Sequence, residues 1–260
     1  MRRLLLVLLA IPLLSGCGGV DGALFATAVR NTKEAGGAEV AFQWNYDIPG
    51  MDKPVVMLGR GFEDVSKRHA RITAQLPAES PIDGDIEAVV DGPVMYMRAP
   101  FLDSELGGKD WMKIDLARTY RTLGVQVDAV GQVGQGSAEQ LDALAHVSDG
   151  VTDEGREIVR GVEATHYSAT VDFDKLPGER LQELAKLGGD TTIDLDVWID
   201  DAKRIRRMEW AQSLPNGGVQ MTMIMEYVRF GVPVDIEPPD DGDVFDATDV
   251  TIQELQQALN

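Results

Sequence analysis

The spacing of hydrophobic residues changes from a helical period to a strand period early in the chain. Over residues 22–34 the apolar side chains recur three and four positions apart, which predicts a helix that ends before the glycine pair Gly36–Gly37. From residue 38 the apolar residues alternate with polar ones, beginning with Val40, Phe42 and Trp44. Alternation places successive side chains on opposite faces, so this stretch predicts a half-buried strand.

Alternation of this kind returns in many short stretches along the chain. The predicted strands are 38–46, 55–63, 68–76, 84–91, 93–99, 111–114, 156–161, 162–173, 191–200, 203–213 and 218–230. Turn-forming pairs such as Pro49–Gly50 and Asn216–Gly217 stand between several of them. Short strands in series, each with one apolar and one polar face, predict an antiparallel sheet that is covered on one side.

Helical patterns interrupt the strands at residues 116–123, 137–148 and 177–187. The second of these helices has a modest apolar stripe and begins at Ser137, which can cap its first turn. Glycines break up the stretch 124–136 that precedes it, and we expect this stretch to form a mobile loop beside the sheet.

The composition changes near the C-terminus, after Glu237-Pro238-Pro239. Five aspartates follow within residues 240–249, which predicts a solvated acidic linker. Beyond them, Ile252, Leu255 and Leu259 have the spacing of a short amphipathic helix. The sequence leaves open whether this helix packs on the body of the protein or frays.

The first residues are typical of an export signal. Arg2 and Arg3 precede a run of 11 apolar residues, Leu4–Leu14, which is much shorter than the roughly 20 residues that a membrane-spanning helix needs. Residues 14–17 read LSGC and look like a bacterial lipobox, in which the cysteine is acylated and the chain is cut before it. We therefore expect a signal peptide at residues 1–16.

Cys17 is the only cysteine of the chain. Because it has no disulfide partner in an oxidising compartment, acylation explains it better than a structural role does. An ordinary secretory signal with an incidental cysteine is the alternative. The sequence predicts a protein that is anchored through Cys17 to the extracytoplasmic face of the cell membrane.

Composition and charge narrow the range of partners. The chain is 44% hydrophobic and has four tryptophans, so it can bury a substantial core. Its formal charge is −19, and loss of residues 1–16 would leave 43 acidic against 22 basic residues, or −21. Such a body is repelled by phosphate backbones and by anionic headgroups. We expect no nucleic-acid partner, and an anchor made of acyl chains rather than a basic patch.

Catalytic and metal-binding patterns do not occur in the sequence. His69, His146 and His166 fall in separate elements, and none has a second histidine or cysteine at ligand spacing. Asp194 and Asp196 lie on one face of a strand and lack the glycine-containing loop of a calcium hand. We expect no metal, no cofactor and no enzyme activity. A hydrolase would require His146 or His166 to lie close to both an acid and a nucleophile.

Methionine occupies alternate positions on two of the predicted strands. Met221, Met223 and Met225 share one face of the last strand, and Met95 and Met97 share one face of an earlier strand. Flexible thioether side chains suit irregular apolar ligands. Taken alone, the pattern is more simply interpreted as core strands that helices bury.

Several stretches resemble the actinobacterial LppX/LprA/LprF/LprG lipoproteins. They are the lipobox, residues 94–97 (VMYM), 108–115 (GKDWMKID), 159–172 (VRGVEATHYSATVD), 196–207 (DVWIDDAKRIRR) and the strand end at 226–234. The resemblance covers most of the chain after Cys17, and its motifs are structural rather than catalytic. The short tether and the long acidic tail depart from the family pattern.

The resemblance implies an α+β fold similar to LolA and LolB. In this fold a strongly curved antiparallel sheet forms an unclosed half-barrel, with helices packed on its concave face. The resemblance also implies that acyl chains of membrane lipids or lipoglycans bind between sheet and helices and are helped through the cell envelope, with a transport partner that the sequence does not identify. The candidate residues that line this cavity are Val40, Phe42, Trp44, Met95, Met97, Met221, Met223 and Met225.

The expected organisation follows from these patterns. A signal peptide at 1–16 precedes a lipidated tether at 17–21, a lipid-binding domain at 22–236, and an acidic linker with a short helix at 237–260. The alternative to a lipid carrier is a non-catalytic envelope scaffold or sensor that docks a protein partner.

Overall fold

The computed structural model describes residues 22–77, 84–124, 150–176, 190–213 and 218–259, together with residues 179, 182, 183 and 186. The predicted signal peptide, Cys17 and its tether lie outside the described residues. So do the predicted helix at 137–148 and nearly all of the loop before it and of the helix at 177–187. These elements stay predictions.

Strands form most of the described structure. They are β1 (Gly37–Asp47), β2 (Val55–Asp64), β3 (His69–Gln75), β4 (Asp85–Asp91), β5 (Val94–Arg98), β6 (Trp111–Asp115), β7 (Thr152–Val159), β8 (Val162–Asp172), β9 (Thr192–Asp200), β10 (Ile205–Ser213), β11 (Gln220–Phe230) and β12 (Val244–Asp246). Every strand that the alternation predicts is present, although β7 begins at Thr152 rather than at residue 156.

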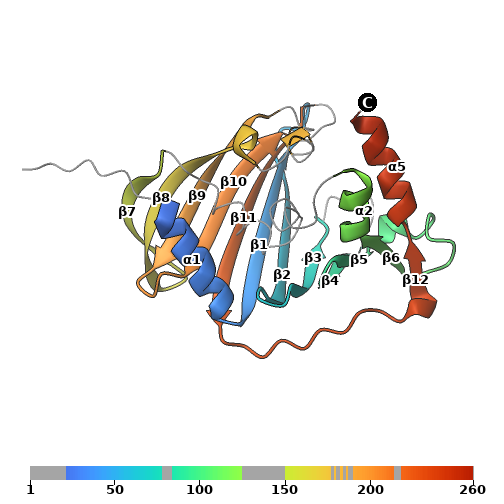
Figure 1. Ribbon diagram of the computed structural model, residues 1–260, viewed down its shortest axis with the longest axis horizontal. Coiled ribbons are helices and arrows are strands. Elements are labelled where there is room, and N and C mark those ends of the chain that lie inside the picture. Colours follow the sequence, from blue (N-terminus) through green and yellow to red (C-terminus); the bar gives the residue numbers. More distant parts are fainter. Residues whose placement is uncertain are drawn as a thin grey trace, which may run out of the picture.

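The strands form one sheet of 12 strands in the order β12-β6-β5-β4-β3-β2-β1-β11-β10-β9-β8-β7. Each neighbouring pair is antiparallel except β12 and β6, which are parallel. Figure 1 shows a strongly curved sheet that does not close, with β7 at one edge and β12 at the other. The predicted α+β class, with an unclosed, curved antiparallel sheet, is confirmed.

Three described helices, α1 (Gly22–Glu34), α2 (Leu116–Thr122) and α5 (Thr248–Ala258), lie on the concave side of the sheet (Figure 1). The helix α1 packs its buried face, with Phe25 and Ala28, on the strands at one end. At the other end α2 and α5 pack against each other and against β6. None of the helices in the described ranges is long and apolar enough to cross a bilayer.

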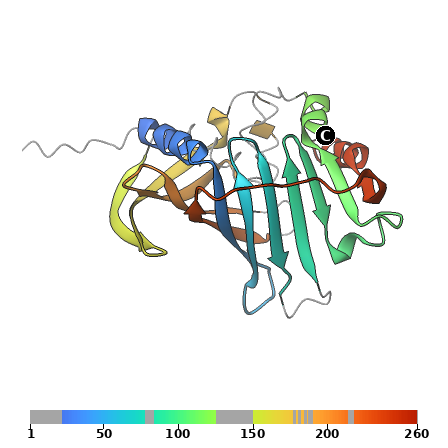
Figure 2. The ribbon, with the colours of Figure 1, turned by 90° about the horizontal axis from the view of Figure 1, so that it is seen from below.

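Residues 231–243, which we call the strap, connect β11 to β12 across the convex face of the sheet (Figure 2). At its start the backbone N–H of Val232 donates to the carbonyl oxygen of Gly37 at 3.0 Å. Further along, Ile236 packs on an apolar cluster of the convex face that consists of Val89, Tyr96 and Trp111. The acidic segment therefore lies on the sheet with its charged side chains exposed.

The chain then returns to the concave side through β12 and α5. Thr248, which is completely buried, accepts a hydrogen bond from the backbone N–H of Asp115 at 3.0 Å. Lys113 and Asp246 form an ion pair at 3.1 Å across the β6–β12 pair. Burial acts to raise the pKa of Asp246, but hydrogen bonds from Thr248 and Lys113 outweigh it and lower that pKa. The predicted C-terminal helix is present and packs on the body.

Substitution of Phe25 tests whether α1 belongs to the core. Phe25 is completely buried, and its ring meets Tyr167 edge-on with centroids 6.2 Å apart. We expect Phe25→Ala to lower the free energy of unfolding by about 3–5 kcal/mol in urea denaturation, because the substitution removes the packing contacts of the ring and leaves a cavity. Phe101, which is 45% exposed, is the matched control, and Phe101→Ala should cost less than about 0.5 kcal/mol. Equal losses for the two variants would contradict this assignment.

Candidate functional site: the concave face of the sheet

The pairing of β1 with β11 brings two groups of candidate residues together. Phe42 lies opposite Met225 and Trp44 lies opposite Met223, so their side chains share the concave face. Val40 and Met225 are completely buried there, and Phe42 and Met223 nearly so. The strand register therefore places Met223 and Met225 next to the candidate residues of β1.

An aromatic stack stands at the centre of this face. The rings of Phe42 and Trp44 are nearly parallel, with an interplanar angle of 9° and centroids 5.4 Å apart. The indole lies over Gly59 of β2, where an added Cβ would be only 2.8 Å from the Trp44 ring atom Cζ3. The indole fits in this position because residue 59 is a glycine and has no side chain.

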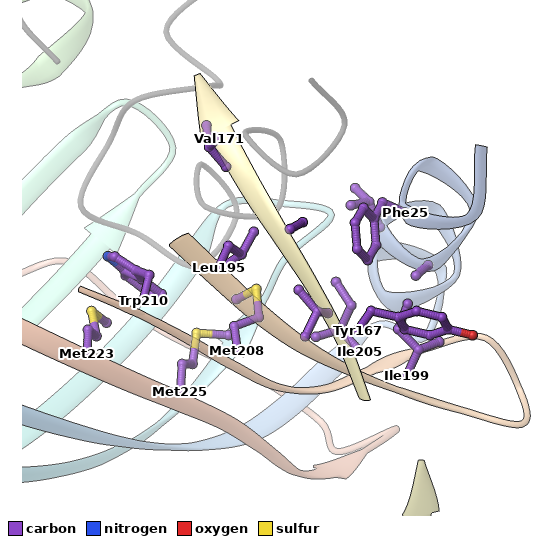
Figure 3. Packing of buried hydrophobic residues seen from close by; sticks show 14 of the residues in the cluster. Phe25, Tyr167, Val171, Leu195, Ile199, Ile205, Met208, Trp210, Met223 and Met225 are labelled. Carbon is purple, nitrogen blue, oxygen red and sulfur yellow. The ribbon is translucent and has the colours of Figure 1, made fainter. Parts of the chain in front are cut away.

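The apolar face continues from β11 across β10, β9 and β8. Figure 3 shows Tyr167 next to Phe25 of α1, with Leu195, Met208 and Trp210 extending from there across the sheet. Together with the β1 and β11 residues they form one continuous buried cluster. At this end of the sheet Met208, Met223 and Met225 are buried core residues.

Met95 and Met97 lie on the same face but in a separate cluster near the β12 edge. They pack with Ile114, Ala247 and Phe245 beneath the junction of β12 and α5. Met95 is buried, whereas Met97 is half-buried. The candidate residues thus fall into two groups, one under α1 and one beside α5.

Between the two groups, several described residues of the concave face are apolar and half-buried. Trp44, Ile72, Ala88, Met97 and Tyr46 are all half-buried. Burial raises the pKa of the Tyr46 hydroxyl, in keeping with apolar surroundings. Leu255 and Leu259, at the C-terminal end of α5, pack against the same cluster as Trp44 and Ile72.

Charged side chains are almost absent from the concave side of the described strands β1–β6. On β1–β6 the strand register places apolar, small or uncharged side chains on the concave side. Among these described positions the one charged residue is Glu63, near the end of β2. The charges stand on the convex face instead, where Glu87 forms ion pairs with Arg71 and Arg98 at 3.2 and 2.7 Å. The described concave positions of β1–β6 therefore present mainly apolar side chains.

The histidines do not form a catalytic site in the described part of the chain. His166 stands on the convex face, stacked on Trp198, with its ring nitrogens 3.2 Å from Glu157 and 2.8 Å from Asp196. The nearby hydroxyl of Ser168 donates to Glu154 rather than to the imidazole. His69 pairs with Asp91, and His146 lies outside the described residues. No group of three potential metal ligands is found among the residues that the structure covers.

The position of the Trp44 indole over Gly59 leads to a testable prediction. We expect Gly59→Ala to lower the free energy of unfolding by about 1–3 kcal/mol and to shift the tryptophan emission, because the new methyl group displaces the indole. Gly242 is the control: it has open space at the Cβ position, and Gly242→Ala should change stability by less than about 0.5 kcal/mol in the same denaturation experiment. Equal behaviour of the two alanine variants would show that the indole does not depend on Gly59.

Comparison of sequences finds one curated relative and no matching protein-family model. The relative is an uncharacterised 31.2 kDa protein of Streptomyces griseus, encoded in the rplA–rplJ intergenic region. It is 30% identical over an alignment of 151 residues, and the match covers 54% of this chain and 49% of the relative. The chain thus spans about half the length of the curated relative that it matches.

Solved structures that are similar to this chain include two mycobacterial proteins, one of them the lipoprotein LppX. LprF from Mycobacterium bovis is 16% identical, with 84% of this chain and 96% of that chain covered and a TM-score of 0.45. LppX from Mycobacterium tuberculosis is 14% identical, with 84% and 100% covered and a TM-score of 0.48. A LolA superfamily protein from Nitrosomonas europaea is 8% identical, with 86% and 97% covered and a TM-score of 0.36. None of these similarities assigns a ligand or an activity to this chain.

Proposed function

We propose that this protein is a membrane-anchored carrier that binds acyl chains of lipids or glycolipids on the concave face of its sheet and helps them through the cell envelope. The observation that carries the proposal is the apolar, nearly charge-free surface between the two buried clusters. Its half-buried residues, such as Trp44 and Ile72, would become fully buried against an alkyl chain. Each methylene removed from water contributes about 0.8 kcal/mol, so burying roughly ten methylenes of an acyl chain would contribute about 8 kcal/mol against the cost of association.

The anchor in this proposal is an acylated Cys17. Two or more acyl chains hold a protein stably at a membrane even when its charge is unfavourable. The helix α1 begins at Gly22, a few residues after Cys17, so the carrier would stay close to the bilayer from which it takes lipid.

A non-catalytic scaffold that docks a protein partner is the second candidate. What supports it is a row of exposed apolar side chains on the convex side of β2, where Val56, Leu58 and Phe62 are 41%, 56% and 45% exposed. Exposed apolar patches often mark interaction surfaces. The row is short and interrupted by Arg60, which is why the carrier is preferred.

A charge placed on the concave face separates the two candidates. We expect Ala88→Arg to reduce the amount of non-covalently bound lipid at least about tenfold, because a guanidinium next to an alkyl chain costs more than 1.4 kcal/mol. The measurement is native mass spectrometry with lipid extraction on the full chain. A Cys17→Ser background keeps covalent acyl groups out of the measurement.

Thr73→Arg, on the convex side of the neighbouring strand, is the matched control and should leave the bound lipid unchanged. The carrier proposal fails if the unmodified concave face carries no extractable lipid, or if both arginine variants lose lipid equally while remaining folded.

The anchor has its own test. We expect Cys17→Ser to abolish incorporation of a radiolabelled fatty acid, because serine has no thiol to acylate. Retention of the label in the serine variant would exclude Cys17 as the site of acylation.

A further inference from the structure

The β7–β8 hairpin carries an arginine at its tip in an uncommon backbone conformation. Arg160 and Gly161 have φ angles of 49° and 81°, as in a tight turn that requires left-handed residues. This conformation is unfavourable for a residue with a side chain. Beside the tip, Val159 packs with Trp198 on the convex face of the sheet. The hairpin end is therefore held against that face.

Arg160 reaches from this tip to a distant strand. Its guanidinium donates to the Oε2 atom of Glu226 on β11 at 2.7 Å, although β9 and β10 stand between β8 and β11 in the sheet. A long-range ion pair fixes the tip of the hairpin above the middle of the convex face.

A hollow of about 350 Å³ lies next to this ion pair. It is lined by Ala41, Phe42, Gln43, Leu58, Gly59, Arg160, Arg207, Ile224 and Glu226. Ala41 lies between Arg60 and Glu226 in the register, and its small side chain leaves the space between longer neighbours unfilled. The volume is at the lower end of the range for small-molecule sites.

The charges around the hollow differ from those of the chain as a whole. The protein carries −19, yet the hollow contains two guanidinium groups and a single carboxylate. Glu226 is bound closely by Arg160, whereas the nearest nitrogen of Arg207 is 4.0 Å from its Oε1 atom. Since Glu209 pairs with Arg207 from outside the lining, the hollow is close to neutral and is less repulsive to an anion than the rest of this acidic protein.

Arg207 is held in position without using all of its donors. Its guanidinium lies 4.7 Å above the ring of Trp198 and donates to Glu209 at 2.6 Å. Its Nε atom is buried and has no hydrogen-bond partner among the described residues. Because a guanidinium has five N–H donors and favours bidentate carboxylates, this side chain is suited to accept a further anion.

We propose that the hollow binds a carboxylate carried on a short aliphatic chain. The carboxylate would pair with Arg207 beside Arg160, and the chain would lie on Ala41, Leu58 and Ile224. A free aliphatic acid and the C-terminal leucine-like residue of a polypeptide share this chemistry. The site is on the opposite face of the sheet from the acyl-binding surface, so it does not depend on the proposed carrier function.

The test is methyl NMR of the full-length Cys17→Ser protein during titration with octanoate, N-acetyl-leucine or octanol. We expect saturable shifts of the Ala41, Leu58 and Ile224 methyl signals with the two carboxylates. Octanol, which lacks the charge, should bind at least about tenfold more weakly, because a charge-assisted pair is lost. Tighter binding of octanoate would identify a free acid as the ligand, and tighter binding of N-acetyl-leucine a polypeptide end.

Two variants assign the anion contact. Arg207→Gln should weaken binding at least about tenfold, whereas Arg60→Gln, on the adjacent strand but outside the lining, should not. If Arg207→Gln does not fold, the comparison of octanoate with octanol decides alone. Equal binding of octanol, or equal loss in both variants, would overturn the proposal.

The Met223 and Met225 methyl signals report the concave face in the same spectra. Shifts confined to these two signals would overturn the convex site while leaving the carrier function intact. Shifts confined to the convex methyl groups would support the hollow whatever the outcome of the lipid extraction.

Discussion

The pairing of β1 with β11 is the contact on which the rest of the structure depends. It joins the meander β1–β6 to the strands β7–β11, which are distant in the sequence, and it runs from Ala38 opposite Phe230 to Asp47 opposite Gln220. Closing such a long loop is entropically costly, so the pair must be specified strongly. The alternation of apolar and polar residues specifies this register. A shift of one residue would turn Phe42 and Trp44 to the convex side and remove their rings from the concave face.

This register separates the chemistry of the two faces. The concave side receives the aromatic and methionine side chains, while the convex side receives the ion pairs, the strap and the hollow beside Arg160. The sheet edges are protected by different means. At one edge β12 is only three residues long, and at the other β7 is charged and bulged beside Gly155, which is unfavourable for pairing with another chain.

Alternation predicted the strands and the face of each candidate residue, because both follow from a local period of two. It could not predict where a residue lies across the sheet, since that depends on strand order. Met95 therefore stands apart from Met223 although both face inward. β12 was not predicted because its three residues sit among aspartates and become a strand only by pairing with β6. The contact of Arg160 with Glu226 left no local signal, because it joins residues 66 positions apart.

The partial cover of the concave face reconciles the two interpretations of its methionines. A side chain that is already fully buried, such as Met225, gains nothing from a ligand and belongs to the packed core of the sheet. A half-buried side chain such as Trp44 still exposes apolar area that a bound chain can remove from water. A carrier needs both kinds of residue, since the sheet must keep its curvature when the ligand leaves. The packed core under α1 supplies that rigidity, and the partly covered strands between α1 and α5 are where an acyl chain would gain its free energy of binding.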